Sequence, residues 1–119
     1  MNSRSLKISF VLTLFFFGIL PIFSDSWSNQ LSEPLTISAA NTKCKEMGGG
    51  MRLPSKADFE KALASGVVKG WKLSKTLSSV YWTSTPDSSN KNFTFDANKG
   101  TFASNRNDMT MFIRCYSPK

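Results

Sequence analysis

The hydrophobic pattern of this chain changes near its middle, from a helical period to the alternation that is typical of strands. A first helix is expected over residues 35–48, with Ser38 as its N-cap. Ala40, Cys44 and Met47 fall on one face of this helix, and a run of glycines ends it. These three residues are therefore expected to face the core.

A second helix is expected to begin at Ser55, because Ser55 and Asp58 have the spacing of a capping box. Gly66 is expected to end this helix, since glycine readily adopts the left-handed conformation found there. Its buried stripe is expected to contain Phe59, Ala62 and Leu63.

The second half of the chain has the composition of strands and turns. The expected strands are residues 80–84, 92–97, 101–104 and 109–116. Residues 85–91 are typical of a turn, and Asn98-Lys99-Gly100 is typical of a hairpin turn. In the last strand, alternation puts these residues on one inward face: Met109, Met111, Ile113 and Cys115. Helices followed by antiparallel strands predict an α+β domain.

Trp82 lies in the segment with the strongest strand composition, next to Tyr81. We expect both Trp82 and Leu53 to be buried in the core. The functional alternative is that the Trp82 ring is an exposed platform on which a sugar ring stacks.

The N-terminal residues have the three parts of a secretory signal peptide. Arg4 and Lys7 form a positively charged start, residues 8–23 are almost wholly apolar, and small residues follow. Cleavage after Ser24 or after Ser26 fits this pattern. The alternative is an uncleaved membrane anchor, but the apolar run before its proline is shorter than the roughly 20 residues that a spanning helix needs.

The length of 119 residues suits one domain, and the sequence divides into three parts. These parts are a signal peptide at residues 1–24, a polar lead-in at residues 25–35 and one domain at residues 36–119. Trp27 or Leu31 is expected to dock the lead-in onto the domain. No stable membrane span is expected after cleavage.

The two cysteines, Cys44 and Cys115, both follow the expected signal peptide. An even number of cysteines in a small exported domain is typical of a disulfide. Both residues lie on faces that are expected to point inward, so a bond from the first helix to the last strand is geometrically reasonable. This bond would close a loop of about 70 residues and stabilise the fold by about 4 kcal/mol.

The exported part of the chain is basic. Removing Arg4 and Lys7 from the 15 basic residues leaves 13 against 8 acidic residues, a net charge of +5. Such a charge favours sulfated glycans, acidic membranes or acidic proteins as partners, or only keeps the domain soluble. Export argues against a nucleic acid. The candidate polyanion-binding residues avoid the apolar stripes of the helices and are Lys43, Lys45, Lys56 and Lys61.

The sequence lacks the side chains that most catalytic and metal sites need. It has no histidine, which excludes the usual Ser–His and Cys–His nucleophiles and histidine-containing zinc sites. Two cysteines cannot form a four-cysteine zinc site, and no phosphate-binding glycine motif is present. A pair of carboxylates is the remaining catalytic alternative. We expect neither an enzyme nor a cofactor.

Aspartate and asparagine cluster in loops around Asp87, Asp96 and Asp108. Calcium takes about six to eight oxygen ligands, whereas turn chemistry alone explains these residues, so we expect no calcium site.

The run Asn92-Phe93-Thr94 has the N-glycosylation pattern. That pattern matters only in a eukaryotic host, and the rest of the chain is typical of bacteria.

Three motifs occur in order: residues 44–59 (CKEMGGGMRLPSKADF), residues 80–86 (VYWTSTP), and an ending made of Phe95-Asp96, Gly100 and residues 113–116 (IRCY). Together they resemble the Lcl C-terminal domain family, which consists of bacterial exported domains largely of unknown function. The resemblance covers residues 36–116. Met51 and Phe59 depart from the family pattern, which usually has Trp and often has Leu at these places.

The resemblance implies a C-type-lectin-like fold, also similar to that of formylglycine-generating enzymes. Such a fold has two helices, a twisted antiparallel sheet and one disulfide from the first helix to the last strand. The Glu-Pro-Asn and Trp-Asn-Asp motifs of calcium-dependent lectins are absent from the sequence. Neither calcium-dependent sugar binding nor oxidase chemistry is therefore carried over, because fold does not imply function.

The sequence favours an exported, non-catalytic bacterial binding module in the periplasm, at the cell surface or in the medium. Its partner would be a glycan, a polyanion or a host or envelope protein, bound without calcium by the loops that follow the Tyr81-Trp82 strand on a rigid scaffold. The alternative is a structural envelope-associated protein that binds no small ligand.

Overall fold

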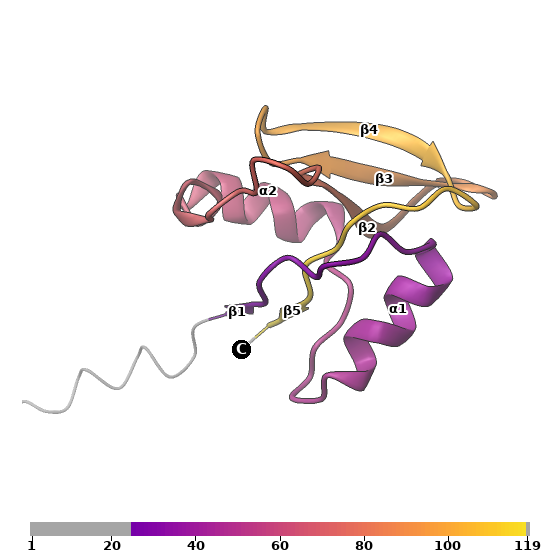
Figure 1. Ribbon diagram of the computed structural model, residues 1–119, viewed down its shortest axis with the longest axis horizontal. Helices are drawn as coiled ribbons and strands as arrows, with labels where there is room; N and C mark the ends of the chain where they lie inside the picture. The colour runs from indigo at the N-terminus through magenta and orange to yellow at the C-terminus, as the bar shows by residue number, and fades with distance from the viewer. Residues whose placement is uncertain (1–24, 119) are drawn as a thin grey trace, which may run out of the picture.

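The computed structural model describes residues 25–118 of the chain (Figure 1). Two helices lie beside antiparallel strands, which confirms the α+β prediction. The elements are β1 (Ser26–Trp27), α1 (Ile37–Glu46), α2 (Lys56–Ala64), a 3-10 turn (Val68–Gly70), β2 (Val80–Ser88), β3 (Lys91–Asp96), β4 (Thr101–Arg106) and β5 (Tyr116–Ser117). The expected signal peptide at residues 1–24 lies outside the described residues. No helix within residues 25–118 has the length and apolar character that crossing a bilayer requires.

A three-stranded antiparallel sheet, in the order β2-β3-β4, forms one layer of the domain. Tyr81 pairs with Phe95, and Phe95 pairs with Phe102, so one face of the sheet carries a row of aromatic rings. The turn between β3 and β4 contains the expected Asn98-Lys99-Gly100. Gly100 has a φ of 70° there, a conformation that favours glycine.

Strand β2 is longer than the sequence indicated. The turn expected at residues 85–91 is wrong in extent, because β2 continues to Ser88 and only Ser89 and Asn90 form the turn. The pairing register with β3 shifts on both sides of Pro86. Proline has no N–H to donate to a ladder, and an irregular register lets the strand continue past it.

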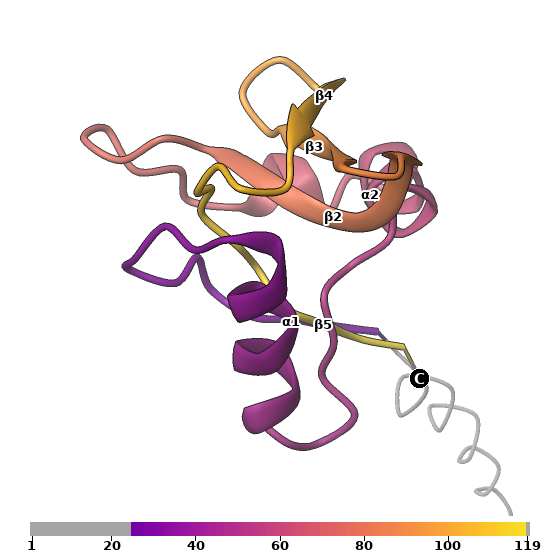
Figure 2. The ribbon, with the colours of Figure 1, turned by 90° about the vertical axis from the view of Figure 1, so that its right-hand side faces the viewer.

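The C-terminal segment is not the single strand that was expected at residues 109–116. Its pairs are Leu35 with Met111, then Tyr81 with Phe112, then β1 with β5. The segment therefore lies between the lead-in and β2 and changes partner along its length; Figure 2 shows β1 and β5 side by side at its end. Ile113 and Cys115 are buried as expected, whereas Met109 precedes these pairings and is 40% exposed.

Helix α1 has a different cap from the predicted one. The side chain of Thr36, not that of Ser38, accepts the N-capping hydrogen bond, so the helix begins closer to the lead-in. Ala40 and Cys44 are buried as expected. Met47 is 49% exposed, because it follows the last helical residue and lies at the end of the stripe.

Helix α2 begins with the predicted capping box. Ser55 Oγ accepts a hydrogen bond from Asp58 N, and Asp58 Oδ2 accepts one from Ser55 N. Phe59 and Ala62 are buried as expected. Leu63 is 36% exposed, because it lies at the edge of the stripe beside the turn between β3 and β4.

Two hydrophobic clusters fill the domain. The disulfide cluster contains Ala40, Cys44, Leu53, Trp82, Ile113 and Cys115. The aromatic cluster contains Phe59, Ala62, Val68, Tyr81, Phe95 and Ala97. The predicted burial of Trp82 and Leu53 is confirmed, and Trp82 Nε1 donates a hydrogen bond to Leu35 O at 2.7 Å. A fully buried ring cannot be a stacking platform for a ligand.

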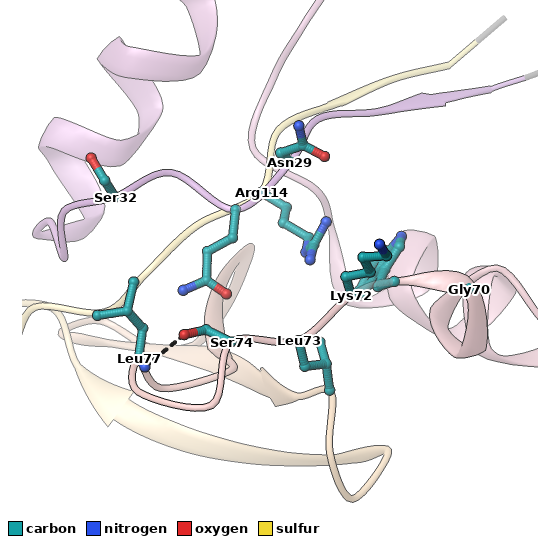
Figure 3. Close-up of a pocket in the computed structure, with 10 residues that line it drawn as sticks. Asn29, Ser32, Gly70, Lys72, Leu73, Ser74, Leu77 and Arg114 are labelled. Atoms are coloured by element: carbon teal, nitrogen blue, oxygen red, sulfur yellow. Dashed lines mark hydrogen bonds between the residues drawn. The ribbon is translucent and has the colours of Figure 1, made fainter.

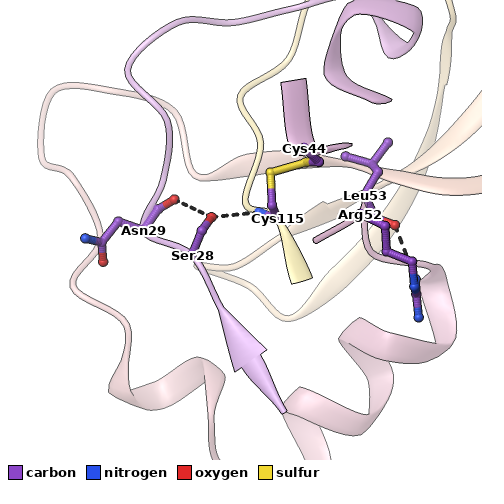
Figure 4. Close-up of a disulfide and its surroundings, with 6 residues drawn as sticks. All are labelled: Ser28, Asn29, Cys44, Arg52, Leu53 and Cys115. Carbon is purple, nitrogen blue, oxygen red and sulfur yellow. Dashed lines mark hydrogen bonds between the residues drawn. A yellow bond between two sulfur atoms is a disulfide. The ribbon is translucent and has the colours of Figure 1, made fainter. Parts of the chain in front are cut away.

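The Cys44–Cys115 disulfide confirms the predicted bond and joins α1 to the residue before β5 (Figure 4). The two cysteines are 71 residues apart in sequence. Beside the bond, Ser28 Oγ accepts a hydrogen bond from Cys115 N, and Ser28 N donates one to Cys115 O, both at 2.8 Å. The lead-in docks through both candidate residues, since Leu31 packs against the disulfide cluster and Trp27 against the aromatic cluster.

Candidate functional site

A cleft of about 750 Å³ lies where three distant parts of the chain meet (Figure 3). Its walls come from the lead-in, from the loop at residues 70–77 and from the C-terminal segment. Its lining includes Asn29, Gln30, Trp71, Lys72, Leu77 and Arg114. A volume in this range is typical of pockets that bind small ligands. We name it the Arg114 cleft.

Arg114 is a buried charged residue in the wall of this cleft, with an exposed fraction of 4%. Its Nη1 donates a hydrogen bond to Ser28 O at 3.2 Å. Its buried Nε has no hydrogen-bond partner, and no ion pair within residues 25–118 includes this guanidinium. Burial of a charge without a carboxylate partner costs free energy, because the lost hydration is only partly replaced.

Aromatic rings surround the guanidinium. Its Cζ lies 4.3 Å from the ring centroid of Trp71 and 5.4 Å from that of Tyr81. Trp71 in turn packs against Trp27 and Phe59, with centroid distances of 5.2 and 6.3 Å. Cation–π contacts stabilise the positive charge but accept none of its in-plane N–H groups. The Nε–H of Arg114 thus still lacks an acceptor.

The alternation of the C-terminal segment explains why Arg114 points away from the disulfide. Ile113 and Cys115 both belong to the disulfide cluster, so the residue between them is directed to the opposite side. The lead-in holds this segment in place, because Leu31 N donates to Ile113 O at 3.0 Å and Ser28 N donates to Cys115 O. The backbone on both sides of Arg114 is therefore anchored.

Hydrogen bonds also hold the other two walls of the cleft, the lead-in and the loop at residues 70–77. Gln30 Nε2 donates to Ser78 O at 3.1 Å, and Gln30 Oε1 accepts a hydrogen bond of 2.7 Å from the Tyr81 hydroxyl. In the loop at residues 70–77, Ser74 Oγ accepts a hydrogen bond from Leu77 N at 2.9 Å. The walls are thus positioned before any ligand binds, which lowers the entropic cost of binding.

The cleft carries positive charge. Lys72 and Arg114 line it, and none of its lining residues, all of them within residues 25–118, is acidic. Figure 3 shows the Arg114 side chain directed into the space between Asn29, Lys72 and Leu73. The field in such a hollow favours an anion, because low-dielectric walls reduce screening.

The lysines predicted to bind a polyanion lie outside this cleft. Lys43 and Lys45 are exposed in the last turn of α1, where positive charge complements the helix dipole. Lys56 and Lys61, in α2, form ion pairs of 3.7 and 3.1 Å with a carboxylate of the same helix and with one of the lead-in, respectively. Figure 1 shows α1 and α2 at different sides of the molecule, so the four lysines fall into two separate pairs, one on each helix.

Arg114 is not among the site residues expected from the sequence. One signal could have revealed it: a single arginine interrupts the otherwise apolar run at residues 111–116. A charged residue between two inward positions requires a partner of its own. Its contact with Ser28, 86 residues away in sequence, could not be read from that pattern.

The metal-binding and glycosylation alternatives can be compared with the described residues. Within residues 25–118, no group of three His, Cys, Asp or Glu side chains is placed to hold a metal ion. Asp96 Oδ1 accepts hydrogen bonds from Asn98 N and Lys99 N of its own turn. Asn92 of the glycosylation pattern is 7% exposed, and its Nδ2 donates to Thr83 O, so a glycan could not be attached without local unfolding.

No protein-family model matches this chain, and no curated protein sequence matches it either. The function must therefore be inferred from the cleft itself. Its distinguishing group is a buried arginine that lacks a carboxylate partner within residues 25–118.

Proposed function

We propose that the mature domain is an exported, non-catalytic module that binds an anionic ligand, without calcium, in the Arg114 cleft. The observation that carries this proposal is the buried guanidinium whose Nε has no partner within residues 25–118. An anion that accepted a hydrogen bond from Nε would neutralise the buried charge and satisfy the open donor at once. Charge-assisted hydrogen bonds of this kind are among the strongest that proteins make.

The disulfide supports export, because such bonds persist in the periplasm, at the cell surface and in the medium. The order of elements supports the C-type-lectin-like fold that the resemblance to the Lcl C-terminal domain family implies. The chain has two helices, an antiparallel sheet and a disulfide from the first helix to the C-terminal segment. A scaffold of this kind can carry binding residues on its loops. The loop at residues 70–77 lines the Arg114 cleft, although it precedes the Tyr81-Trp82 strand, whereas the sequence pointed to the loops after that strand.

The alternative function is structural, at the cell envelope and without a small ligand. Its support is that Arg114 has internal contacts, because it donates to Ser28 O and lies over the Trp71 ring. The guanidinium would then only tie the lead-in to the loop. Replacement of Arg114 would lower stability under this alternative, whereas it would lower affinity under the binding proposal.

Calorimetric titration of the exported protein with a panel of anionic glycans, including heparin, separates the two functions. The wild type would be compared with Arg114→Met and with Arg106→Met as a matched control. Arg106 is an arginine outside the cleft, 63% exposed at its side chain and paired with Asp108. We expect the wild type and the control to bind, with an affinity that falls as salt rises and does not change with EDTA. Arg114→Met should bind at least about tenfold more weakly.

Absence of binding by the wild type to every anion would contradict the proposal and favour the structural alternative. A second pair of variants tests the lysines. Heparin binding that survives in Arg114→Met but is lost in Lys56→Glu/Lys61→Glu would assign polyanion binding to α2 instead of the cleft.

A further inference from the structure

We infer, on the basis of the proposed function, that the anionic group bound in the Arg114 cleft is the carboxylate of an acidic sugar, such as a uronic acid. The inference depends on which edge of the guanidinium is free and on the chemistry of the surrounding walls. Both can be described residue by residue.

The free edge of Arg114 has the geometry of a carboxylate site. Nη1 is occupied by Ser28 O, whereas Nε has no partner and Nη2 donates no hydrogen bond within residues 25–118. Nε–H and the outer Nη2–H are parallel donors on one edge of a guanidinium, and they match the two oxygens of a carboxylate. The Trp71 and Tyr81 rings lie against the same guanidinium and keep it from turning.

The charge of the site suits a monoanion. One guanidinium is buried, and Lys72 is the only other cation among the lining residues, all of which lie within residues 25–118. A phosphate monoester carries about −1.5 to −2 charges at neutral pH and needs more donors than this cleft supplies. A carboxylate carries a single charge and needs only one bidentate arginine.

The walls of the cleft suit a ring that bears hydroxyl groups. Asn29 and Ser32 present exposed side chains from the lead-in, and these side chains make no hydrogen bond within residues 25–118. Leu73 and Leu77 present apolar surface from the loop, and Leu77 is 41% exposed (Figure 3). A sugar ring has hydroxyl edges and an apolar C–H face, so it uses both walls. Peptide C-termini are instead held by backbone groups, whereas the free groups here belong to side chains.

The test is a titration of the exported protein, followed by the amide signals of residues 28–32 and 70–77 in NMR spectra. The probes are D-glucuronate, D-glucose, D-glucose 6-sulfate and acetyl-dialanine with a free C-terminus. We expect D-glucuronate to shift these signals at concentrations at which the other three probes do not. Arg114→Lys keeps the charge but loses the parallel donors, so it should weaken D-glucuronate binding by about tenfold.

Lys72→Met and Arg106→Met complete the experiment. Lys72 is exposed at the cleft, so its replacement should weaken D-glucuronate binding by about threefold without affecting the fold, whereas Arg106→Met should bind as the wild type does. Equal binding of D-glucose 6-sulfate, or of acetyl-dialanine, would overturn the acidic-sugar inference and leave an anion-binding function in place. Failure of every anionic probe to shift these signals would overturn the proposed function as well.

Discussion

The disulfide cluster and the aromatic cluster lie on opposite sides of the C-terminal segment, and they are completed in different ways. The disulfide cluster is closed by a covalent bond, and the indole N–H at its centre has an acceptor in Leu35 O. The aromatic cluster ends at Arg114, whose Nε has no partner, and at an open cleft. A region with all its groups satisfied contributes stability, whereas a region with one unsatisfied buried donor gains the most from a ligand. We therefore assign stability to the disulfide cluster on one side of the C-terminal segment and binding to the cleft on its other side.

The largest expected effect is at the centre of the disulfide cluster. Trp82→Ala removes a fully buried ring and leaves Leu35 O without its donor, so it should lower the free energy of unfolding by about 3–5 kcal/mol. Trp71→Ala, at a half-buried ring of the cleft wall, is the matched control and should cost clearly less. Urea unfolding of both variants measures the difference, and equal costs would contradict this division.

The second effect concerns the covalent closure. Cys44→Ala/Cys115→Ala opens a loop of 71 residues and should lower the free energy of unfolding by about 2–4 kcal/mol. Reduction of the wild type by dithiothreitol should reproduce this loss and should leave the double variant unchanged. Thiol labelling of the unreduced, denatured wild type should find no free cysteine; a labelled cysteine would show that the bond is not formed in the purified protein.

The third effect sharpens the contrast, because it separates affinity from stability. Arg114→Met replaces an unpaired buried charge by an apolar side chain, so the free energy of unfolding should stay within about 1 kcal/mol of the wild type. The affinity for anions should fall at least about tenfold in the same variant. Thermal unfolding and calorimetry on one preparation measure both quantities. A large loss of stability would make Arg114 part of the structural framework.

The smallest expected effect is a pH dependence of the stability, which arises at Tyr116 in β5. Burial, followed by the hydrogen bond that its hydroxyl donates to Asp25, raises the pKa of Tyr116 from 10.0 to about 12. Because the folded-state pKa is the higher one, the stabilisation is fully present below pH 10 and is lost as the pH rises towards 12. Tyr116→Phe should show a shallower fall in stability than the wild type over this window. Parallel curves for the two proteins would contradict the expectation.

Short-range patterns predicted much of the fold. The capping box of Ser55 and Asp58 and the turn before Gly100 involve residues only a few positions apart, so the sequence contains all of their partners. The expectations that failed concern which residues are covered by other elements and how far the strands extend. Met47 and Met109 have the right periodicity but stay exposed, because periodicity cannot show what covers a face.

By itself, the sequence determined the α+β class, the Cys44–Cys115 bond and the burial of Trp82, because apolar periodicity and a single pair of cysteines leave few alternatives. Only the tertiary structure decided where a binding site can lie. The Arg114 cleft needs the lead-in, the loop at residues 70–77 and the C-terminal segment to meet, and Arg114 and Ser28 are 86 residues apart. The local sequence pattern shows which side chains avoid water. Whether a buried charge has a partner depends on how distant segments of the chain pack together.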